Sequence, residues 1–322
     1  MTRKILRSAI LLVIALGGAS LALAQSYPSR PVRIVVPFAV GGNSDRIARA
    51  LSDSLGKTFN QHFVVENRPG AGGAIGVDIV GKSTPDGYTL LKCTVGQFAI
   101  LPHLQKLGYN PLKDFAPISN LGSNSLVVSV HGSVPAKTFR EFVDYVKANP
   151  GKVSYGSAGN GSFSHFSTAM FVARAGLNMI HVPYKGGPLA TQDLIAGQLN
   201  TYFGNAPDLV PHAKTGRIVL LAVTSEKRDR ALPDLPAIAE LYPGFSTVSW
   251  NGLMAPAGTP KEIIDRLARE VQKALREPAM IARFEQMGID AIGSTPGELA
   301  ELMRRDFARY GEAVKTAGIR AE

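Results

Sequence analysis

Four short polar or glycine-rich segments each follow an apolar, strand-like run and directly precede a predicted helix. They are Val40-Gly41-Gly42-Asn43-Ser44-Asp45, Thr94-Val95-Gly96-Gln97, Ser157-Ala158-Gly159 with Gly161-Ser162, and Tyr184-Lys185-Gly186-Gly187. The start of a helix presents backbone N–H groups without intrahelical partners and the positive end of the helix dipole, so each junction suits an anion. Four such junctions in one chain predict a binding site for a small acid.

Individual side chains in and near these segments allow more than one role. Asp45 suits the helix dipole, which we favour, or a ligand ammonium or hydroxyl. His165, one turn inside its helix, is favoured as a packed or capping residue over a ligand contact. Tyr184 is suited to stacking on a ligand or hydrogen-bonding to it, and Lys185 to pairing with an anion or to simple solvation. Asn205 is a polar group at a further strand end, where ligands of parallel sheets collect.

Motifs for other chemistries are missing from the sequence. The glycines of Gly70–Gly76 do not have dinucleotide-binding spacing, and no phosphate-binding Gly-Lys-Ser/Thr ending or Gly-x-Ser-x-Gly nucleophile motif occurs. The six His lack metal-ligand spacing, and Cys93 ends an apolar run, which favours a small buried residue over a nucleophile. We therefore expect no catalytic residue, no metal and no cofactor.

The chain carries a formal net charge of +10, but its Lys and Arg are scattered and are not interleaved with aromatics. This pattern predicts mild attraction of acidic ligands and no nucleic-acid partner. With a single Cys, the chain cannot form an internal disulfide, so stability must come from packed cores.

The N-terminus has the three parts of a secretory signal. Arg3, Lys4 and Arg7 precede the apolar stretch Ala9–Leu23, and Ala22-Leu23-Ala24 fits a cleavage site. We expect residues 1–24 to be removed during export to the periplasm, and an uncut membrane anchor is the less favoured alternative.

Alternating strand-like and helical patterns predict an α/β fold with mainly parallel sheets. Capping-box patterns at Thr138–Glu141, Thr259–Glu262 and Thr295–Glu298 predict three helix starts. The economical arrangement has two lobes joined by two crossover strands near residues 124 and 246. Lobe 1 comprises residues 25–124 plus 247–322, lobe 2 comprises residues 125–246, and a cleft between them closes about a hinge.

Longer motifs resemble one family along essentially the whole chain after the signal. They include Tyr27-Pro28-Ser29-Arg30-Pro31, Val65-Glu66-Asn67-Arg68-Pro69-Gly70-Ala71-Gly72-Gly73, Pro85-Asp86-Gly87-Tyr88-Thr89-Leu90-Leu91, His181-Val182-Pro183-Tyr184-Lys185-Gly186 and Ala255-Pro256-Ala257-Gly258-Thr259-Pro260. These are similar to the Bug-type extracytoplasmic solute receptors of tripartite tricarboxylate transporters.

The resemblance implies a two-lobed periplasmic binding protein of the type II kind, a monomer that closes on a carboxylate without catalysis. It implies ligand contacts from the loops 40–45, 94–97, 157–162 and 184–187 and from Asn205. The ligand classes expected are dicarboxylates, aromatic acids and acidic amino acids, and Val95, where a small polar residue is common, favours an apolar or aromatic body. Delivery to transporter membrane subunits is expected, with presentation to a sensor ectodomain, or an exported enzyme, as alternatives.

Overall fold

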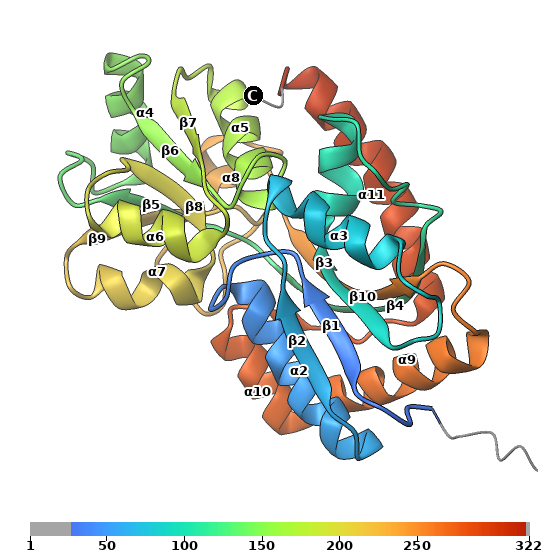
Figure 1. The fold of residues 1–322 in the computed structure, drawn as a ribbon. Helices are drawn as coiled ribbons and strands as arrows, with labels where there is room; N and C mark the ends of the chain where they lie inside the picture. The colour runs from blue at the N-terminus through green and yellow to red at the C-terminus, as the bar shows by residue number, and fades with distance from the viewer. Residues whose placement is uncertain (1–26, 320–322) are drawn as a thin grey trace, which may run out of the picture.

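The computed structural model describes residues 27–319, which form two β-sheets in separate halves of the molecule (Figure 1). We call the half built on the six-stranded sheet lobe 1 and the half built on the five-stranded sheet lobe 2. The expected two-lobed α/β fold is confirmed. The predicted signal peptide lies outside the described residues.

Lobe 1 has three layers. Its strands, in spatial order, are β11 (Asp290–Ala291), β4 (Phe115–Asn124), β10 (Ser249–Pro256), β3 (Thr89–Thr94), β1 (Val32–Val36) and β2 (Phe63–Asn67). Its helices are α2 (Asn43–Phe59), α9 (Lys261–Arg276) and α10 (Pro278–Gln286) on one face, and α3 (Ala74–Gly81) and α11 (Pro296–Thr316) on the other. Successive side chains of a strand point to opposite faces, so Ile34 packs with the first group and Val35 with the second.

Lobe 2 repeats this layering on a smaller sheet. Its strands, in spatial order, are β7 (Ile180–Pro183), β6 (Ser154–Ser157), β8 (Thr201–Gly204), β5 (Val127–His131) and β9 (Ile218–Val223). Its main helices are α4 (Phe139–Ala148) and α5 (Phe163–Ala175) on one face, and α6 (Gly187–Ile195) and α7 (Ala206–Ala213) on the other.

Both sheets are mixed: most strands of each run in one direction, as predicted, but β10 and β11 in lobe 1 and β5 in lobe 2 run against them, which the prediction did not include. In lobe 1, β1 is parallel to β2 and β3, whereas β10 and β11 pair antiparallel. In lobe 2, β6 is parallel to both its neighbours, whereas β5 is antiparallel to β8 and β9. The physical reason is the chain path: β5 and β10 carry the chain from one lobe into the other and therefore enter their sheets against the local βαβ direction.

The two crossings lie side by side and are joined through buried Thr224. Its hydroxyl accepts a hydrogen bond from the Leu126 amide (2.9 Å) and donates to the Thr247 carbonyl (2.9 Å). Its own carbonyl accepts the Thr247 amide (2.9 Å). One apolar cluster also continues from lobe 1 into lobe 2, where the rings of Phe166 on α5 and Tyr310 on α11 meet edge to face at 4.9 Å. The lobes are thus in contact both at the crossings and through this apolar cluster.

Two of the three predicted capping boxes form. Thr138 and Thr295 each accept from the amide of a glutamate three residues later, at the starts of α4 and α11. The box predicted at Thr259 does not form, because the Thr259 hydroxyl donates to the Pro256 carbonyl (2.8 Å) and α9 begins one residue later, at Lys261.

Short helical segments complete the described chain. They are η1 (Ala71–Gly73), the π-helical turn η2 (Gly96–Ile100), η3 (Leu101–His103) and α8 (Ile238–Leu241). Among residues 27–319, no helix combines the length and apolar character needed to cross a membrane.

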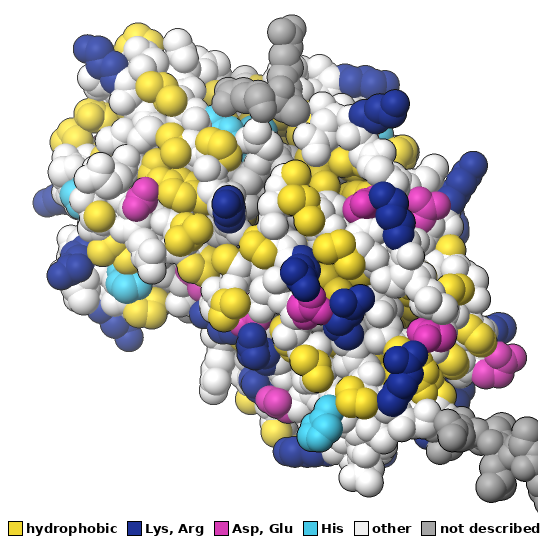
Figure 2. All heavy atoms as spheres, viewed as in Figure 1, with side chains coloured by type: hydrophobic (Ala, Val, Ile, Leu, Met, Phe, Trp, Pro, Cys, Tyr) yellow, Lys and Arg dark blue, Asp and Glu magenta, His cyan; other side chains and the backbone are white. Residues whose placement is uncertain are grey.

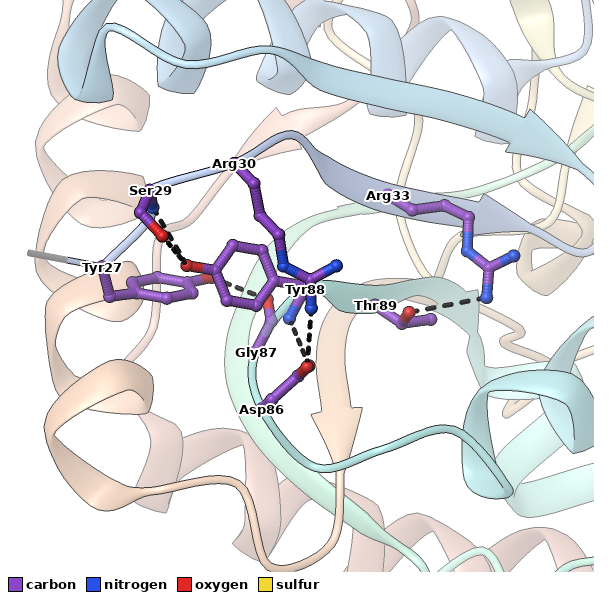
Figure 3. A network of polar contacts seen from close by, with 8 residues as sticks. All are labelled: Tyr27, Ser29, Arg30, Arg33, Asp86, Gly87, Tyr88 and Thr89. Atoms are coloured by element: carbon purple, nitrogen blue, oxygen red, sulfur yellow. Dashed lines mark hydrogen bonds and ion pairs between the residues drawn. The ribbon is translucent and has the colours of Figure 1, made fainter. Parts of the chain in front are cut away.

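The segment before β1 is fixed by a network that Figure 3 shows. The Tyr27 hydroxyl donates to the Gly87 carbonyl (2.7 Å), and Arg30 pairs with Asp86 (2.9 Å) while its guanidinium lies 4.1 Å from the centre of the Tyr88 ring. This network lies at the amino ends of β1 and β3. The opposite, carboxyl ends of these strands face the other lobe.

Candidate functional site

A pocket lies between the lobes at the carboxyl ends of the central strands. It encloses about 610 Å³ of space outside atoms, part of it open solvent at the mouth. Its walls come from both lobes: Asn43, Ser44 and Thr94 from lobe 1 face Ser162, Gly187 and Asn205 from lobe 2. Residues of both crossings line the same pocket. An inter-lobe cleft is a common place for a ligand.

Four helices of eight or more residues begin at this pocket. They are α2, whose N-cap is Gly42; α5, whose N-cap is Ser162; α6, which starts at Gly187; and α7, whose N-cap is Asn205. Only α5 among these four has a side-chain cap, the Ser162 hydroxyl accepting the His165 amide (3.3 Å). First-turn N–H groups and positive dipole ends therefore converge on one cavity, which suits an anionic ligand.

The predicted residues divide into three groups by position. Those that line this pocket are Gly42, Asn43, Ser44, Thr94, Ala158, Ser162, Gly187 and Asn205. A second hollow, which shares Phe38 and Ala158 with the first, is lined in part by Gly159, Tyr184 and Lys185. Those that line neither are Val40, Gly41, Asp45, Val95, Gly96, Gln97, Ser157, Gly161, His165 and Gly186.

Several residues of the third group hold the loops in place. The Gln97 side chain is fully buried, accepts from the amide (2.9 Å) and hydroxyl (3.0 Å) of Thr94, and donates to the Gly72 carbonyl (3.0 Å). Val95 is fully buried in the apolar core, and Val40 is 63% exposed. The side chain of Val95 therefore packs in the core and lines neither hollow.

Asp45 makes its polar contacts to neighbours in its own lobe. Its carboxylate accepts the Gly41 amide (3.0 Å) and a two-point contact from Arg49 (2.9 and 3.1 Å). Burial by itself would raise the pKa of Asp45, but the hydrogen bonds from Arg49 and Gly41 hold it below its usual value. The carboxylate thereby fixes the turn that leads into α2.

His165 likewise supports a loop. Its Nδ1 accepts the Gly161 amide (3.1 Å), and its ring stacks on that of His181 with centroids 4.0 Å apart. The Nε2 atom of His181 lies 2.7 Å from the Ser157 hydroxyl, which also accepts the Gly159 amide (3.1 Å). Burial lowers the pKa of His165 to about 4; burial and the neighbouring His165 lower the pKa of His181 to about 3. Both rings are therefore neutral near pH 7.

A chain of amides forms one side of the pocket. Asn251 on β10 donates to Asn124 at the end of β4 (3.0 Å), and Asn124 donates to Asn205 (3.0 Å). Asn205 in turn donates to Asp208 (3.5 Å), which pairs with Arg46 on α2. The amide oxygens of Asn124 and Asn205 each accept a hydrogen bond from the amide before them in this series. The series of side-chain contacts runs from lobe 1 to lobe 2 and, through the ion pair, back to lobe 1.

Lys92, which the sequence analysis did not single out, donates to the first amide of this series. Lys92 on β3 is fully buried, and its Nζ donates to Asn251 Oδ1 (2.7 Å) and Ser44 Oγ (2.8 Å). Both acceptors are neutral, and both line the pocket. Burial lowers the pKa of Lys92 to about 7. The sequence feature that could have indicated this residue is a single Lys within the otherwise apolar run Leu90–Cys93.

Other lining residues had weak sequence signals or none. They are Phe38, Ala39, Asn124, Leu126, Phe163, Ser164, Pro188, Tyr202, Asp208, Ser249 and Asn251. Several flank the predicted turns by one or two positions. Asn124, Ser249 and Asn251 lie on crossing strands, whose place at the pocket depends on how the two sheets meet.

The lobes touch around the pocket. An ideal Cβ on Gly72 in lobe 1 would lie 1.9 Å from the Asn160 carbonyl oxygen in lobe 2, and one on Gly42 would lie 3.3 Å from Pro188. Gly72 and Asn160 line the second hollow, whereas the Arg46–Asp208 ion pair joins the lobes beside the first pocket, which Asp208 lines. In residues 27–319, no cluster of three or more His, Cys, Asp or Glu could hold a metal ion.

The fold and the pocket together define a two-lobed solute-binding protein. A tripartite tricarboxylate transporter family receptor model matches residues 47–319. The chain belongs to this family of Bug-type receptors.

Individual relatives resemble the chain over nearly its full length. Protein BugT of Bordetella pertussis is 34% identical over 92% of this chain and 91% of its own. The periplasmic binding protein BugD has a solved structure that matches with a TM-score of 0.88, at 36% identity over 92% of this chain and all of its own. A protein of R. palustris, solved with adipate, matches with a TM-score of 0.88, at 34% identity over 91% of this chain and 99% of its own.

Proposed function

We propose that this protein is an exported, non-catalytic receptor that captures a small carboxylate between its lobes and delivers it to the membrane subunits of a tripartite tricarboxylate transporter. The observation that carries the proposal is the convergence of four helix N-termini on the inter-lobe pocket. Membership of the receptor family and the adipate-bound relative support a carboxylate ligand. The periplasmic relative BugD supports an extracytoplasmic location.

The binding energy available at such a site suits reversible capture. A hydrogen bond to a charged group contributes about 1.5–3 kcal/mol. Three or four of them, less the costs of association and ordering, give about the −8 kcal/mol of a micromolar complex. Asn43 adds a requirement: its Oδ1 is buried at the pocket and has no hydrogen-bond partner among the described residues. A ligand hydroxyl, ammonium or water bridging to this oxygen would satisfy it.

Capture proceeds by hinge closure in this proposal. The lobes divide at residues 25–124 plus 247–322 and 125–246, and the hinge is the pair of crossings that Thr224 joins. The inter-lobe contacts of Gly72 and Arg46 form on closure and enclose the ligand. The receptor acts as a monomer, since one chain supplies both walls of the pocket.

The direct test is a thermal-shift panel of mono-, di- and tricarboxylates, aromatic acids and amino acids on the purified protein. A ligand at 100 times its dissociation constant adds about 2.7 kcal/mol of stability, which is several degrees for a chain of this size. A selective shift identifies the ligand class. Chemically unchanged ligand recovered after incubation supports a receptor, whereas a converted product would contradict it.

Asn43→Asp tests the location of the site. The change is nearly isosteric and places a negative charge at the start of α2, where the helix dipole tolerates it. It should therefore preserve folding while strongly weakening binding of the panel's best carboxylate. Asn178→Asp adds the same charge at an exposed position on lobe 2 outside both hollows and is the matched control. Equal affinity of the two variants would show that the ligand binds elsewhere.

A further inference from the structure

Lys92 is a buried cation placed one hydrogen bond behind the pocket wall. Its Nζ is shielded from solvent and contacts two neutral oxygens, Ser44 Oγ and Asn251 Oδ1. An ammonium in such surroundings is costly unless an anion compensates it. The proposed carboxylate site lies directly beyond Ser44.

No described side chain supplies the missing negative charge. The ionised side chains next to Ser44 on α2, the helix that Lys92 contacts, are engaged with other partners: Asp45 with Arg49, and Arg46 with Asp208. Strand β10, the antiparallel partner of Lys92, has no titratable side chain. Burial raises the pKa of the adjacent Cys93 thiol to about 12, so it is neutral.

The Ser44 hydroxyl transmits the charge state of Lys92 to the pocket. While the ammonium donates to Ser44 Oγ, the hydroxyl proton has no acceptor among the described residues and is free to donate to a ligand in the pocket. A neutral Lys92 amine has a lone pair, and the hydroxyl can then donate inward to Nζ. Loss of the Lys92 proton thus removes both the positive charge and a donor from the anion site.

We propose that Lys92 is the buried counter-charge of the ligand site, and that it acts through Ser44 to select an anionic group and to couple ligand binding to the uptake of a proton. This inference rests on the proposed function. The proton balance is as follows: protein with neutral Lys92, one ligand carboxylate and one proton give a complex in which the Lys92 ammonium lies behind Ser44 and the Ser44 hydroxyl donates to the carboxylate. No bond other than N–H forms.

The coupling has a defined pH range. Burial lowers the pKa of Lys92 in the free protein to about 7, and a bound anion raises it again. Binding should therefore take up a fraction of a proton at pH 7 and a larger fraction at pH 8, approaching one proton as the pH rises. The affinity should fall at least about tenfold between pH 7 and pH 9, because the binding-competent ammonium becomes rare.

Calorimetric titration with adipate tests this, in buffers of low and high ionisation heat at pH 7, 8 and 9. Lys92→Met should bind adipate more weakly at pH 7, lose proton uptake and show a nearly flat pH dependence. Ser44→Ala should also weaken binding and reduce the uptake. Lys147→Met removes an equivalent charge from the exposed side of α4 and should retain the wild-type pH profile.

Ligand-free unfolding gives a second readout. The unfolded Lys92 holds its proton up to higher pH than the folded one, so wild type should gain stability relative to Lys92→Met as the pH rises from 7 to 10. A constant difference between them would overturn the inference, as would equal proton uptake by wild type and Lys92→Met. If wild type binds neither adipate nor any other carboxylate of the panel between pH 6 and pH 9, the proposed function fails and the inference fails with it.

Discussion

Gly72→Ala should block closure of the lobes while leaving each lobe folded. Gly72 has φ +64°, and a Cβ there would lie 1.9 Å from the backbone oxygen of Asn160 across the cleft. Ordinary contact begins near 3.4 Å, so this oxygen must retreat by about 1.5 Å. Asn160 belongs to the loop that leads into α5, and a backbone atom cannot escape by a change of rotamer.

The expected loss of affinity follows from that displacement. A ligand held by both lobes would lose at least one charge-assisted hydrogen bond, which contributes about 1.5–3 kcal/mol. The dissociation constant should therefore rise about 10- to 100-fold. The left-handed backbone itself costs an alanine about 1–2 kcal/mol of folding stability.

Gly176→Ala separates the two effects. Gly176 ends α5 at φ +62°, and its Cβ would meet nothing within 4 Å. Both variants should lose similar stability in urea unfolding, but only Gly72→Ala should lose affinity in calorimetric titration. Small-angle scattering should show compaction on ligand addition for Gly176→Ala and wild type and little for Gly72→Ala. Equal dissociation constants for the two variants would refute closure at this contact.

Three further outcomes are expected. Arg46→Met removes the inter-lobe partner of Asp208 and leaves a carboxylate uncompensated at the anion site, so adipate affinity measured by calorimetry should fall about tenfold. Folding lowers the pKa values of His165 and His181, so between pH 4 and pH 6.5 the unfolded chain binds more protons than the folded protein. The free energy of unfolding should therefore fall by at least about 3 kcal/mol as the pH drops from 6.5 to 4. Urea unfolding of the double variant His165→Asn/His181→Gln should show a smaller loss. Arg30→Ala, which breaks the exposed contacts in Figure 3, should change stability by only about 0–1 kcal/mol and leave adipate binding unchanged.

The distribution of charged side chains on the visible face agrees with the scattered Lys and Arg of the sequence. Figure 2 shows Lys and Arg side chains spread singly or in small groups over the visible face, with Asp and Glu among them. In the proposed function, the field that attracts a small acid would therefore be focused at the cleft by the helix ends that line it and by Lys92 behind its wall, where the low dielectric strengthens it. Scattered surface charge contributes at longer range and is screened by salt.

Local sequence patterns were sufficient to predict where several helices begin. The glycines and polar residues near Asn43 and Ser162 predicted the starts of α2 and α5, because caps and turns depend on neighbouring residues alone. The same reasoning failed at Thr259, where the hydroxyl found a nearer acceptor in the Pro256 carbonyl. Strand direction was beyond reach, since β5 and β10 are antiparallel only because the chain changes lobes.

The sequence by itself determined that this is an α/β protein with several helix starts suited to an anion. It also carried the family motifs, because these are contiguous and their chemistry is local. Only the tertiary structure decided which of these turns meet: eight predicted residues line the pocket, whereas Gln97, Asp45 and His165 brace the loops around it. It also revealed Lys92 and the amides of Asn251 and Asn124, which lie far apart in sequence. Burial and partner geometry are properties of the packed sheets, so the charge behind the pocket could be found only once the strands were placed side by side.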